Sequence, residues 1–149
     1  KSLIEKKMTK PIIVINGDVL NQINFTSLLN FHNEKRSIAT MCVRDSEFNV
    51  PFGIVNIQND KIIEITEKPS QKHFINAGVY VLDQRALDHL ETGNRVDMTD
   101  LFNKLIGLGH KTVAFPVGEY WTDIGSLNDL QKADEDFKKT FSGRTKFRG

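Results

Sequence analysis

Cysteine, long apolar runs and excess charge are all scarce in this sequence. Its 149 residues include one cysteine, Cys42, so an intrachain disulfide is excluded and a reducing, cytoplasmic location is expected. No apolar run approaches membrane-spanning length, and no signal peptide is visible, so no membrane role is expected. Basic residues number 20 against 19 acidic ones, a balance that gives no indication of nucleic acid as a partner.

An initiator methionine is also absent. The sequence opens at Lys1, and residues 2–7 are typical of the end of a helix, so we expect a piece of a longer protein. Residues 1–139 have the size and apolar content of one domain or part of one. Residues 140–149 are polar and basic and are expected to form a flexible tail.

The most informative stretch is the apolar run Ile12–Ile15, which leads into Asn16-Gly17-Asp18. A continuous run of branched apolar residues is typical of a strand covered on both faces, as in a parallel sheet. Asp18 then lies at the strand exit, where a carboxylate is well placed to hold Mg²⁺. The same triplet also suits a plain polar turn, and the residues alone leave both interpretations open.

The rest of the chain alternates between strand and helix patterns, which predicts an α/β fold with a mostly parallel sheet flanked by helices. Runs on either side of Asn59-Asp60 predict one antiparallel hairpin insertion. Cys42 lies inside a strand pattern and is expected to be a core residue. Further strands are expected over 38–44, 75–82 and 111–117, and helices after Asn24, Asp83, Asp97 or Thr99, and Ser126.

Four short motifs lie at the ends of predicted strands. They are Asn16-Gly17-Asp18, Glu67-Lys68-Pro69, Asn76-Ala77-Gly78 and Trp121-x-Asp123-Ile124-Gly125-Ser126. In this order they resemble the sugar-nucleotide pyrophosphorylases, which form an NDP-sugar and pyrophosphate from an NTP and a sugar 1-phosphate. The chain resembles most the mannose-1-phosphate guanylyltransferase-like branch, up to about Phe137. The resemblance implies a Rossmann-like fold of the nucleotide-diphospho-sugar transferase type, of which this chain would be the C-terminal part of the catalytic domain.

The resemblance also implies roles for individual residues. Asp18 and Asp123 match the two family carboxylates that hold Mg²⁺ against the nucleotide phosphates, a ligand set that suits this cation. For Asp123 the alternative is a turn residue ahead of a helix. The four histidines show no ligand-like spacing with each other or with Cys42, so they are expected to be structural and no zinc site is predicted.

The remaining motif residues would bind the sugar phosphate. Glu67 matches a glutamate that binds sugar hydroxyls, and Lys68 matches a catalytic lysine that contacts phosphate. Asn76 and Gly78 match residues that contact the sugar, and Gly53 matches a glycine whose backbone faces it. Without the resemblance, Glu67 and Lys68 would be a solvated hairpin end. Asn76 and Gly78 would mark a tight strand entry, and Gly53 a bulge.

The glycine-rich phosphate loop of the family has no counterpart in this sequence. We therefore expect the isolated chain to be inactive and to expose a sheet edge or an apolar face, which leaves self-association into a homo-oligomer open. Two other functions stay open. A metal-dependent glycosyltransferase is disfavoured because Leu20 replaces the second carboxylate of an Asp-x-Asp motif. A non-catalytic module that binds sugar phosphate would differ from the enzyme by lacking the phosphate loop.

Overall fold

The fold was analysed in a computed structural model that describes residues 9–91, 93 and 95–141. The predicted helix end at residues 2–7 and residues 142–149 of the predicted tail lie outside the described residues. Thr140 and Phe141, which the sequence assigned to that tail, continue the last helix of the chain.

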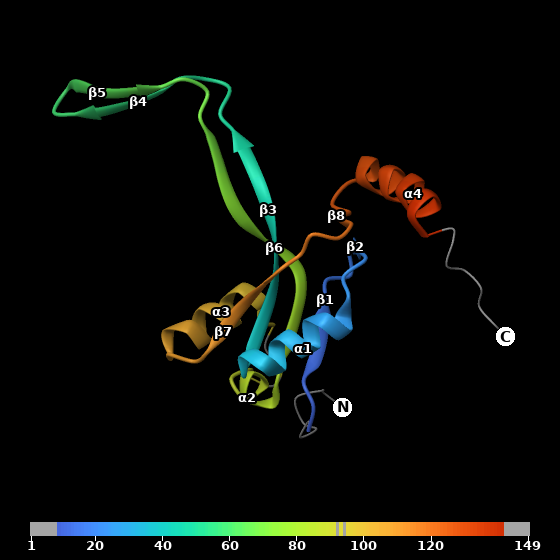
Figure 1. The fold of residues 1–149 in the computed structure, drawn as a ribbon. Coiled ribbons are helices and arrows are strands. Elements are labelled where there is room, and N and C mark those ends of the chain that lie inside the picture. The colour runs from blue at the N-terminus through green and yellow to red at the C-terminus, as the bar shows by residue number, and fades with distance from the viewer. Residues whose placement is uncertain (1–8, 92, 94, 142–149) are drawn as a thin grey trace.

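The central sheet has four strands, β1 (Ile12–Ile15), β3 (Ala39–Asn49), β6 (Ser70–Leu82) and β7 (Thr112–Pro116), in the order β1-β6-β3-β7 (Figure 1). β6 runs antiparallel to both β1 and β3, whereas β3 and β7 are parallel. The predicted α/β fold is confirmed, but the sheet is mixed where the sequence predicted a mostly parallel one. The reason is that β3 returns as β6 through a hairpin-type connection, which reverses the strand direction.

Helices cover both faces of this sheet. On one face, Val79 and Val81 of β6 pack in a cluster with Leu28 of α1 (Phe25–Lys35). On the other face, the alternate residues Tyr80 and Leu82 pack with α2 (Gln84–Leu87) and α3 (Met98–Gly107). No helix of the described part has the length and apolar content needed to cross a bilayer.

The helix starts follow local capping signals that the sequence predicted. The Asn24 side chain accepts a hydrogen bond from the backbone N–H of Ser27 at 3.0 Å. Asp83 accepts from the N–H groups of Arg85 and Ala86. Ser126 precedes α4 (Leu127–Phe141) and accepts from Asp129 N at 3.2 Å. Asp97 begins α3 without a side-chain capping bond.

Cys42 is fully buried in the core, as predicted. Burial, assisted by the negative charge of Glu119, raises the pKa of its thiol to about 12. A thiol with such a pKa stays protonated at neutral pH, so Cys42 acts as a small apolar residue rather than as a nucleophile.

Some predicted inner faces are more exposed than the patterns indicate. β1 is only half-buried and its last residue, Ile15, is 43% exposed, because it is an edge strand of the described sheet. Leu108 lies one helical turn after the buried Leu105, beyond the end of α3, and is 56% exposed. The apolar side of α4 has Ala133 buried but Leu127 80% exposed.

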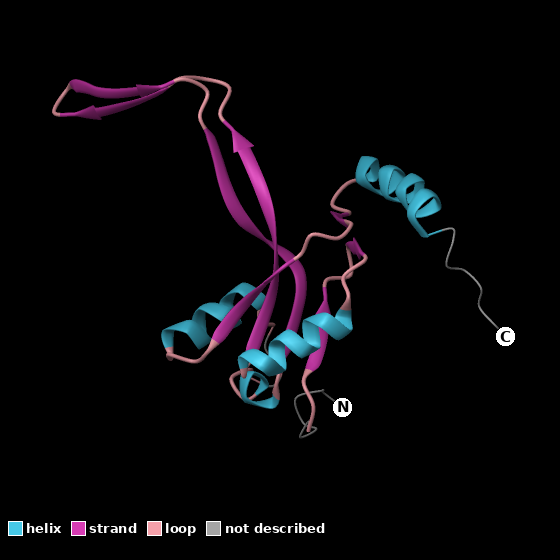
Figure 2. Cartoon of the chain, in the orientation of Figure 1, coloured by secondary structure: helices cyan, strands magenta, loops and turns pink. Residues whose placement is uncertain are grey.

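β3 and β6 continue beyond the sheet as a two-stranded ribbon that leads to a terminal hairpin, β4 (Ile54–Gln58) and β5 (Lys61–Thr66) (Figure 2). We call the ribbon and hairpin together the arm, residues 45–74. Asn59 and Asp60 have φ of 49° and 62°, as a tight hairpin turn requires, so the predicted hairpin is confirmed.

The packing of α1 gives a first prediction. Leu28→Ala removes a fully buried side chain from the core and should lower the free energy of unfolding by about 2–5 kcal/mol. Leu127→Ala, the matched control at an 80% exposed helix position, should change it by less than about 0.5 kcal/mol. Urea denaturation monitored by circular dichroism measures both. Equal losses in the two variants would contradict the described core.

Candidate functional site

Two short strands bring Asp18 and Asp123 together. β2 (Val19–Asn21) pairs antiparallel with β8 (Trp121–Asp123), and in this register Val19 faces Asp123. The backbone N–H of Ile124 donates to the carbonyl of Asp18 at 2.8 Å. Asp18, directly before β2, and Asp123, at the end of β8, therefore lie one register position apart, and both are exposed to solvent.

Gly78 is the point at which this pair of strands rests on the sheet. Its carbonyl accepts a hydrogen bond from the backbone N–H of Asn16 at 2.8 Å. Its φ is +68°, and a Cβ there would lie 3.0 Å from both the Asn16 side-chain amide and Val19 Cγ2. Only glycine combines this backbone angle with this close approach, so Gly78 sets the position of the strand exit that carries Asp18.

Asn76 is held beside Gly78 by its own side chain. Its Oδ1 accepts from Gly78 N at 3.0 Å, and its Nδ2 donates to the Tyr80 hydroxyl at 2.7 Å. Asn16 and Asn76 line a cavity of about 370 Å³ together with Tyr80 and residues of the segment that enters α3. Asn16, two residues before Asp18, is the lining residue that belongs to the turn leading into β2.

Trp121 joins β8 to the sheet. Its indole Nε1 donates to the carbonyl of Ala77 at 2.7 Å, which supports its interpretation as an anchor. The guanidinium of Arg44 lies 5.9 Å from the centre of the Trp121 ring, and it also donates to the carbonyl of Glu119 at 2.9 Å. Arg44 is a cation near Trp121 that no sequence motif marks, since only the folded chain brings these distant residues together.

Gly53, Glu67 and Lys68 lie elsewhere, where the hairpin joins the rest of the arm, away from β2 and β8 (Figure 1). A Cβ on Gly53 would lie 2.9 Å from Oε2 of Glu67, so this glycine leaves space for that carboxylate. Lys68 has a positive φ of 43°. The structure thus brings Asp18 and Asp123 close to Asn76 and Gly78 but keeps the arm residues apart from them.

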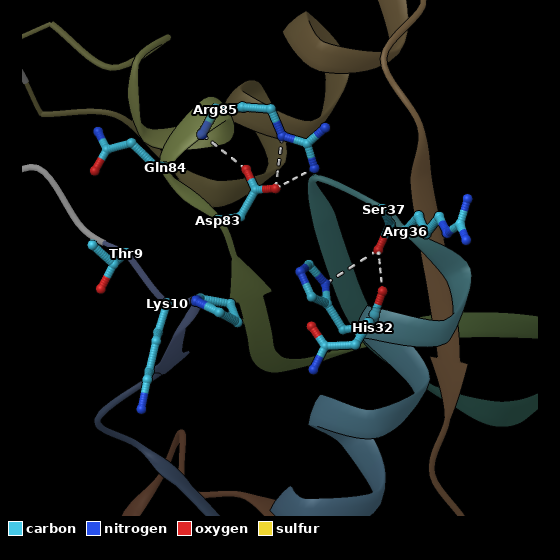
Figure 3. Close-up of a pocket in the computed structure, with 10 residues that line it drawn as sticks. Thr9, Lys10, His32, Arg36, Ser37, Asp83, Gln84 and Arg85 are labelled. Carbon is cyan, nitrogen blue, oxygen red and sulfur yellow. Dashed lines mark hydrogen bonds and ion pairs between the residues drawn. The ribbon is translucent and has the colours of Figure 1, made fainter.

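A second cavity of about 400 Å³ lies at the opposite end of β1 (Figure 3). None of the predicted site residues lines it. One wall is His32, whose Nδ1 is hydrogen-bonded to the hydroxyls of Thr40 at 2.8 Å and Ser37 at 3.1 Å. Burial lowers the pKa of His32, and the nearby Asp83 carboxylate opposes that shift. This buried polar cluster ties α1 to β3, as expected for a structural histidine.

Residues 1–140 of the chain match the protein family described as nucleotidyl transferase. The chain belongs to the nucleotidyl transferase family. The family resemblance carried by the four motifs is therefore confirmed.

Two curated relatives illustrate the likeness. Glucose-1-phosphate adenylyltransferase of Clostridium botulinum is 30% identical over 141 residues, covering 87% of this chain and 36% of that protein. UTP–glucose-1-phosphate uridylyltransferase of a Synechocystis strain is 31% identical over 129 residues, covering 81% of this chain and 33% of that protein. The chain thus spans about a third of the length of these nucleotidyl transferases.

Solved structures show the same fold. HddC from Yersinia pseudotuberculosis superposes with a TM-score of 0.63 at 24% identity, covering 91% of this chain and 59% of that one. A glucose-1-phosphate thymidylyltransferase structure from Bacillus anthracis gives a TM-score of 0.61 at 24% identity, covering 89% and 56%. The two superpositions establish the α/β fold of this chain.

The donor set of the site fits a magnesium ion that also binds phosphates. Among the residues that the structure describes, no three or more histidine, cysteine or acidic side chains gather as a metal cluster. A closed all-protein site is therefore absent from that part of the chain. Mg²⁺ commonly takes only one or two carboxylates and completes its octahedron with phosphate oxygens and water. The exposed neighbours Asp18 and Asp123 meet this requirement.

The buried His32 gives a pH prediction. Its pKa is lowered from the ordinary value of 6.5 in the folded protein, so the unfolded chain takes up this proton first as the pH falls. Stability should therefore fall below pH 6.5 and level off once the pH passes the folded pKa. His32→Gln should remove this contribution to the pH dependence of the unfolding free energy, while His73→Gln, at an exposed position, should not. An unchanged pH profile in His32→Gln would contradict the assignment.

The backbone of Gly78 gives a second prediction. Gly109→Ala introduces a Cβ at a φ of +74° with no atom within 4 Å, and should cost about 1–2 kcal/mol from the backbone angle alone. Gly78→Ala adds contacts at 3.0 Å with Asn16 and Val19, and its loss of unfolding free energy should be clearly larger. Denaturant unfolding of the two variants measures the difference. Equal losses would mean that Gly78 does not fix the turn before Asp18.

Proposed function

We propose that this chain takes part in the transfer of a nucleotidyl group from an NTP to a sugar 1-phosphate. In this reaction a phosphate oxygen of the sugar 1-phosphate attacks the α-phosphorus of the NTP, and pyrophosphate leaves, so that an NDP-sugar forms. The observation that supports the proposal most strongly is the β2–β8 pairing, which brings the backbones of Asp18 and Asp123 within one register position of each other from distant parts of the sequence. Membership of the nucleotidyl transferase family agrees with it.

We propose that Asp18 and Asp123 hold one Mg²⁺ at this position. When bound, the ion would neutralise charge on the reacting phosphates and align the attacking and leaving oxygens. The protein's own part is to keep two carboxylates on neighbouring strands. Gly78 and Trp121 do this by fixing the turn before β2 and the start of β8 against β6.

The sugar phosphate would be bound by groups of two kinds. Asn76, whose side-chain amide is already oriented by Gly78 N and the Tyr80 hydroxyl, lines a cavity together with Asn16, two residues before Asp18. The Glu67 carboxylate would accept bonds from sugar hydroxyls, and the Lys68 ammonium would attract a phosphate as a point charge. Because Glu67 and Lys68 lie on the arm, the arm must bend toward β2 and β8 before all of these groups can act on one substrate.

For the substrates, we propose GTP with mannose 1-phosphate or a related sugar phosphate, following the branch that the motifs resemble. The relatives include an adenylyltransferase and a uridylyltransferase of glucose 1-phosphate. One solved structure of HddC is a complex with GMP-PN. A panel of nucleotides and sugar phosphates therefore has to decide between these bases and sugars.

The test follows pyrophosphate release with Mg²⁺, each of the four NTPs and a panel of sugar 1-phosphates. Both this chain and a longer form that includes any sequence encoded before Lys1 are assayed, because these 149 residues hold no glycine-rich phosphate loop. The longer form should turn over one NTP–sugar pair and the 149-residue chain should not. Asp18→Asn and Asp123→Asn should each lower kcat by about 10²-fold or more. Asp134→Asn, which breaks only an exposed ion pair with Lys138, should leave kcat unchanged.

If pyrophosphate release survives both aspartate substitutions, the proposed reaction would stand, but Asp18 and Asp123 would be excluded as the metal site. If neither form releases pyrophosphate with any NTP–sugar pair, the result would favour a non-catalytic module that binds sugar phosphate. Such a module would differ from the enzyme by lacking the phosphate loop. Robust release by the 149-residue chain alone would contradict the need for a loop outside it.

A further inference from the structure

The strand pair β2–β8, at whose ends Asp18 and Asp123 lie, is small and separate from the four-stranded sheet (Figure 1). Its register is only three residue pairs long. Two-stranded pairs of this size are at best marginally stable in water, so contacts from the rest of the domain must hold the pair in place. On the β2 side, the hydrogen bond from Asn16 N to the Gly78 carbonyl does this.

Trp121 is the residue of β8 that reaches the sheet. Its indole Nε1 donates to the carbonyl of Ala77 in β6 at 2.7 Å, and the residue packs against a buried apolar cluster. Side chains two residues apart on a strand point to the same side, so Trp121 and Asp123 share one side of β8. The position of the indole ring therefore affects the position of the strand that ends in the Asp123 carboxylate.

Arg44 holds this part of the chain through two contacts. Its guanidinium carbon lies 5.9 Å from the centre of the Trp121 ring, within the range of a cation–π contact, and its Nη1 donates to the carbonyl of Glu119 at 2.9 Å. Glu119 lies on the link between β7 and β8, and Trp121 is the first residue of β8. One half-buried side chain therefore fastens both the link and the strand that follows it.

The backbone pairing between β3 and β7 ends just before this point. Its last pair is Val43 with Pro116, and the N–H of Val117 donates to the carbonyl of Val43 at 2.8 Å. Arg44 is the next residue of β3, and its long side chain reaches the part of the link that follows Val117. The side chain of Arg44 thus extends to Trp121 the contact that the backbone of β3 makes as far as Val117.

We propose that Arg44 is a positioning residue, which orients the Trp121 ring and so holds β8 in its register with β2. Its effect on catalysis rests on the nucleotidyl transfer proposed above, whereas its effect on the strand pair does not. A planar guanidinium can stack on a ring through its face and donate a hydrogen bond through its edge at the same time. The ammonium of lysine is a compact point charge, so this role requires arginine rather than any cation.

Amide hydrogen exchange of the 149-residue chain, followed by NMR, tests the effect on the strand pair. Arg44→Met keeps a long side chain beside the ring but removes the charge and the donor. It should speed the exchange of two amides, those of Ile124 and Gln22, by about tenfold, since the strand pair opens more often without its anchor. These amides donate to the carbonyls of Asp18 and Tyr120. Exchange of the β6 amides should stay unchanged.

Two further variants separate the two-contact role of Arg44 from its charge. Arg44→Lys keeps the charge but cannot make both contacts at once, so it should speed the exchange of the Ile124 and Gln22 amides nearly as much as Arg44→Met. Arg85→Met is the matched control. It removes an exposed arginine whose partner is Asp83, at the start of α2, and should leave the exchange of both amides unchanged.

Pyrophosphate release by the longer form tests the effect on catalysis. With the NTP–sugar pair that the longer form turns over, Arg44→Met should lower kcat about tenfold and change KM by less than about twofold. The reason is that Arg44 positions a proposed metal ligand and is not itself a substrate-binding group. Arg85→Met should keep the kcat of the unsubstituted protein.

Unchanged exchange of the Ile124 and Gln22 amides in Arg44→Met would overturn the proposal, as would unchanged exchange in Arg44→Lys. An equal acceleration throughout β6 would also overturn it, because it would show a general loss of stability. If the longer form is active and Arg44→Met does not lower its kcat, the role in catalysis is excluded. If exchange changes as expected but the unsubstituted longer form turns over no NTP–sugar pair, the proposed function fails and the role of Arg44 in the strand pair is supported.

Discussion

The inner strand β6 is the constraint on which the rest of the structure depends. It pairs with β1 on one side and β3 on the other, and Ala77, Val79 and Val81 in it have no exposed surface. Its alternating side chains serve the helix layers on both faces of the sheet. The same strand fixes the candidate site, because Gly78 accepts the bond from the turn before β2 and Ala77 accepts the bond from the β8 indole.

Features that depend on neighbouring residues could be predicted from the sequence. The hairpin turn at Asn59-Asp60 requires positive φ, which asparagine and aspartate tolerate, and this signal is complete within four residues. The side-chain caps at Asn24 and Asp83 are equally local. The family was also predictable, because its motifs are short sequences whose order can be read along the chain.

Features that depend on distant segments could not be predicted. Nothing local shows that β6 lies between β1 and β3, and this insertion makes the sheet mixed. The position of Arg44 over the Trp121 ring likewise exists only in the folded protein. Gly53 and Glu67 were predicted to share a site with Asp18, but motifs specify residue types rather than the course of the arm that carries them. The register shift between Asn56 and Ile57 in the terminal hairpin is another feature that alternation patterns do not reveal.

The central claim is that the β2–β8 pairing makes Asp18 and Asp123 into one cation site. The most direct measurement is a crystal structure of the protein soaked with Mn²⁺ and pyrophosphate, with data collected at the manganese absorption edge. The account predicts one anomalous peak bound by a carboxylate oxygen of Asp18 and one of Asp123, at about 2.2 Å from each, near the distance expected for hard divalent ions. A peak bound elsewhere, or no ordered Mn²⁺ between these strands, would contradict it.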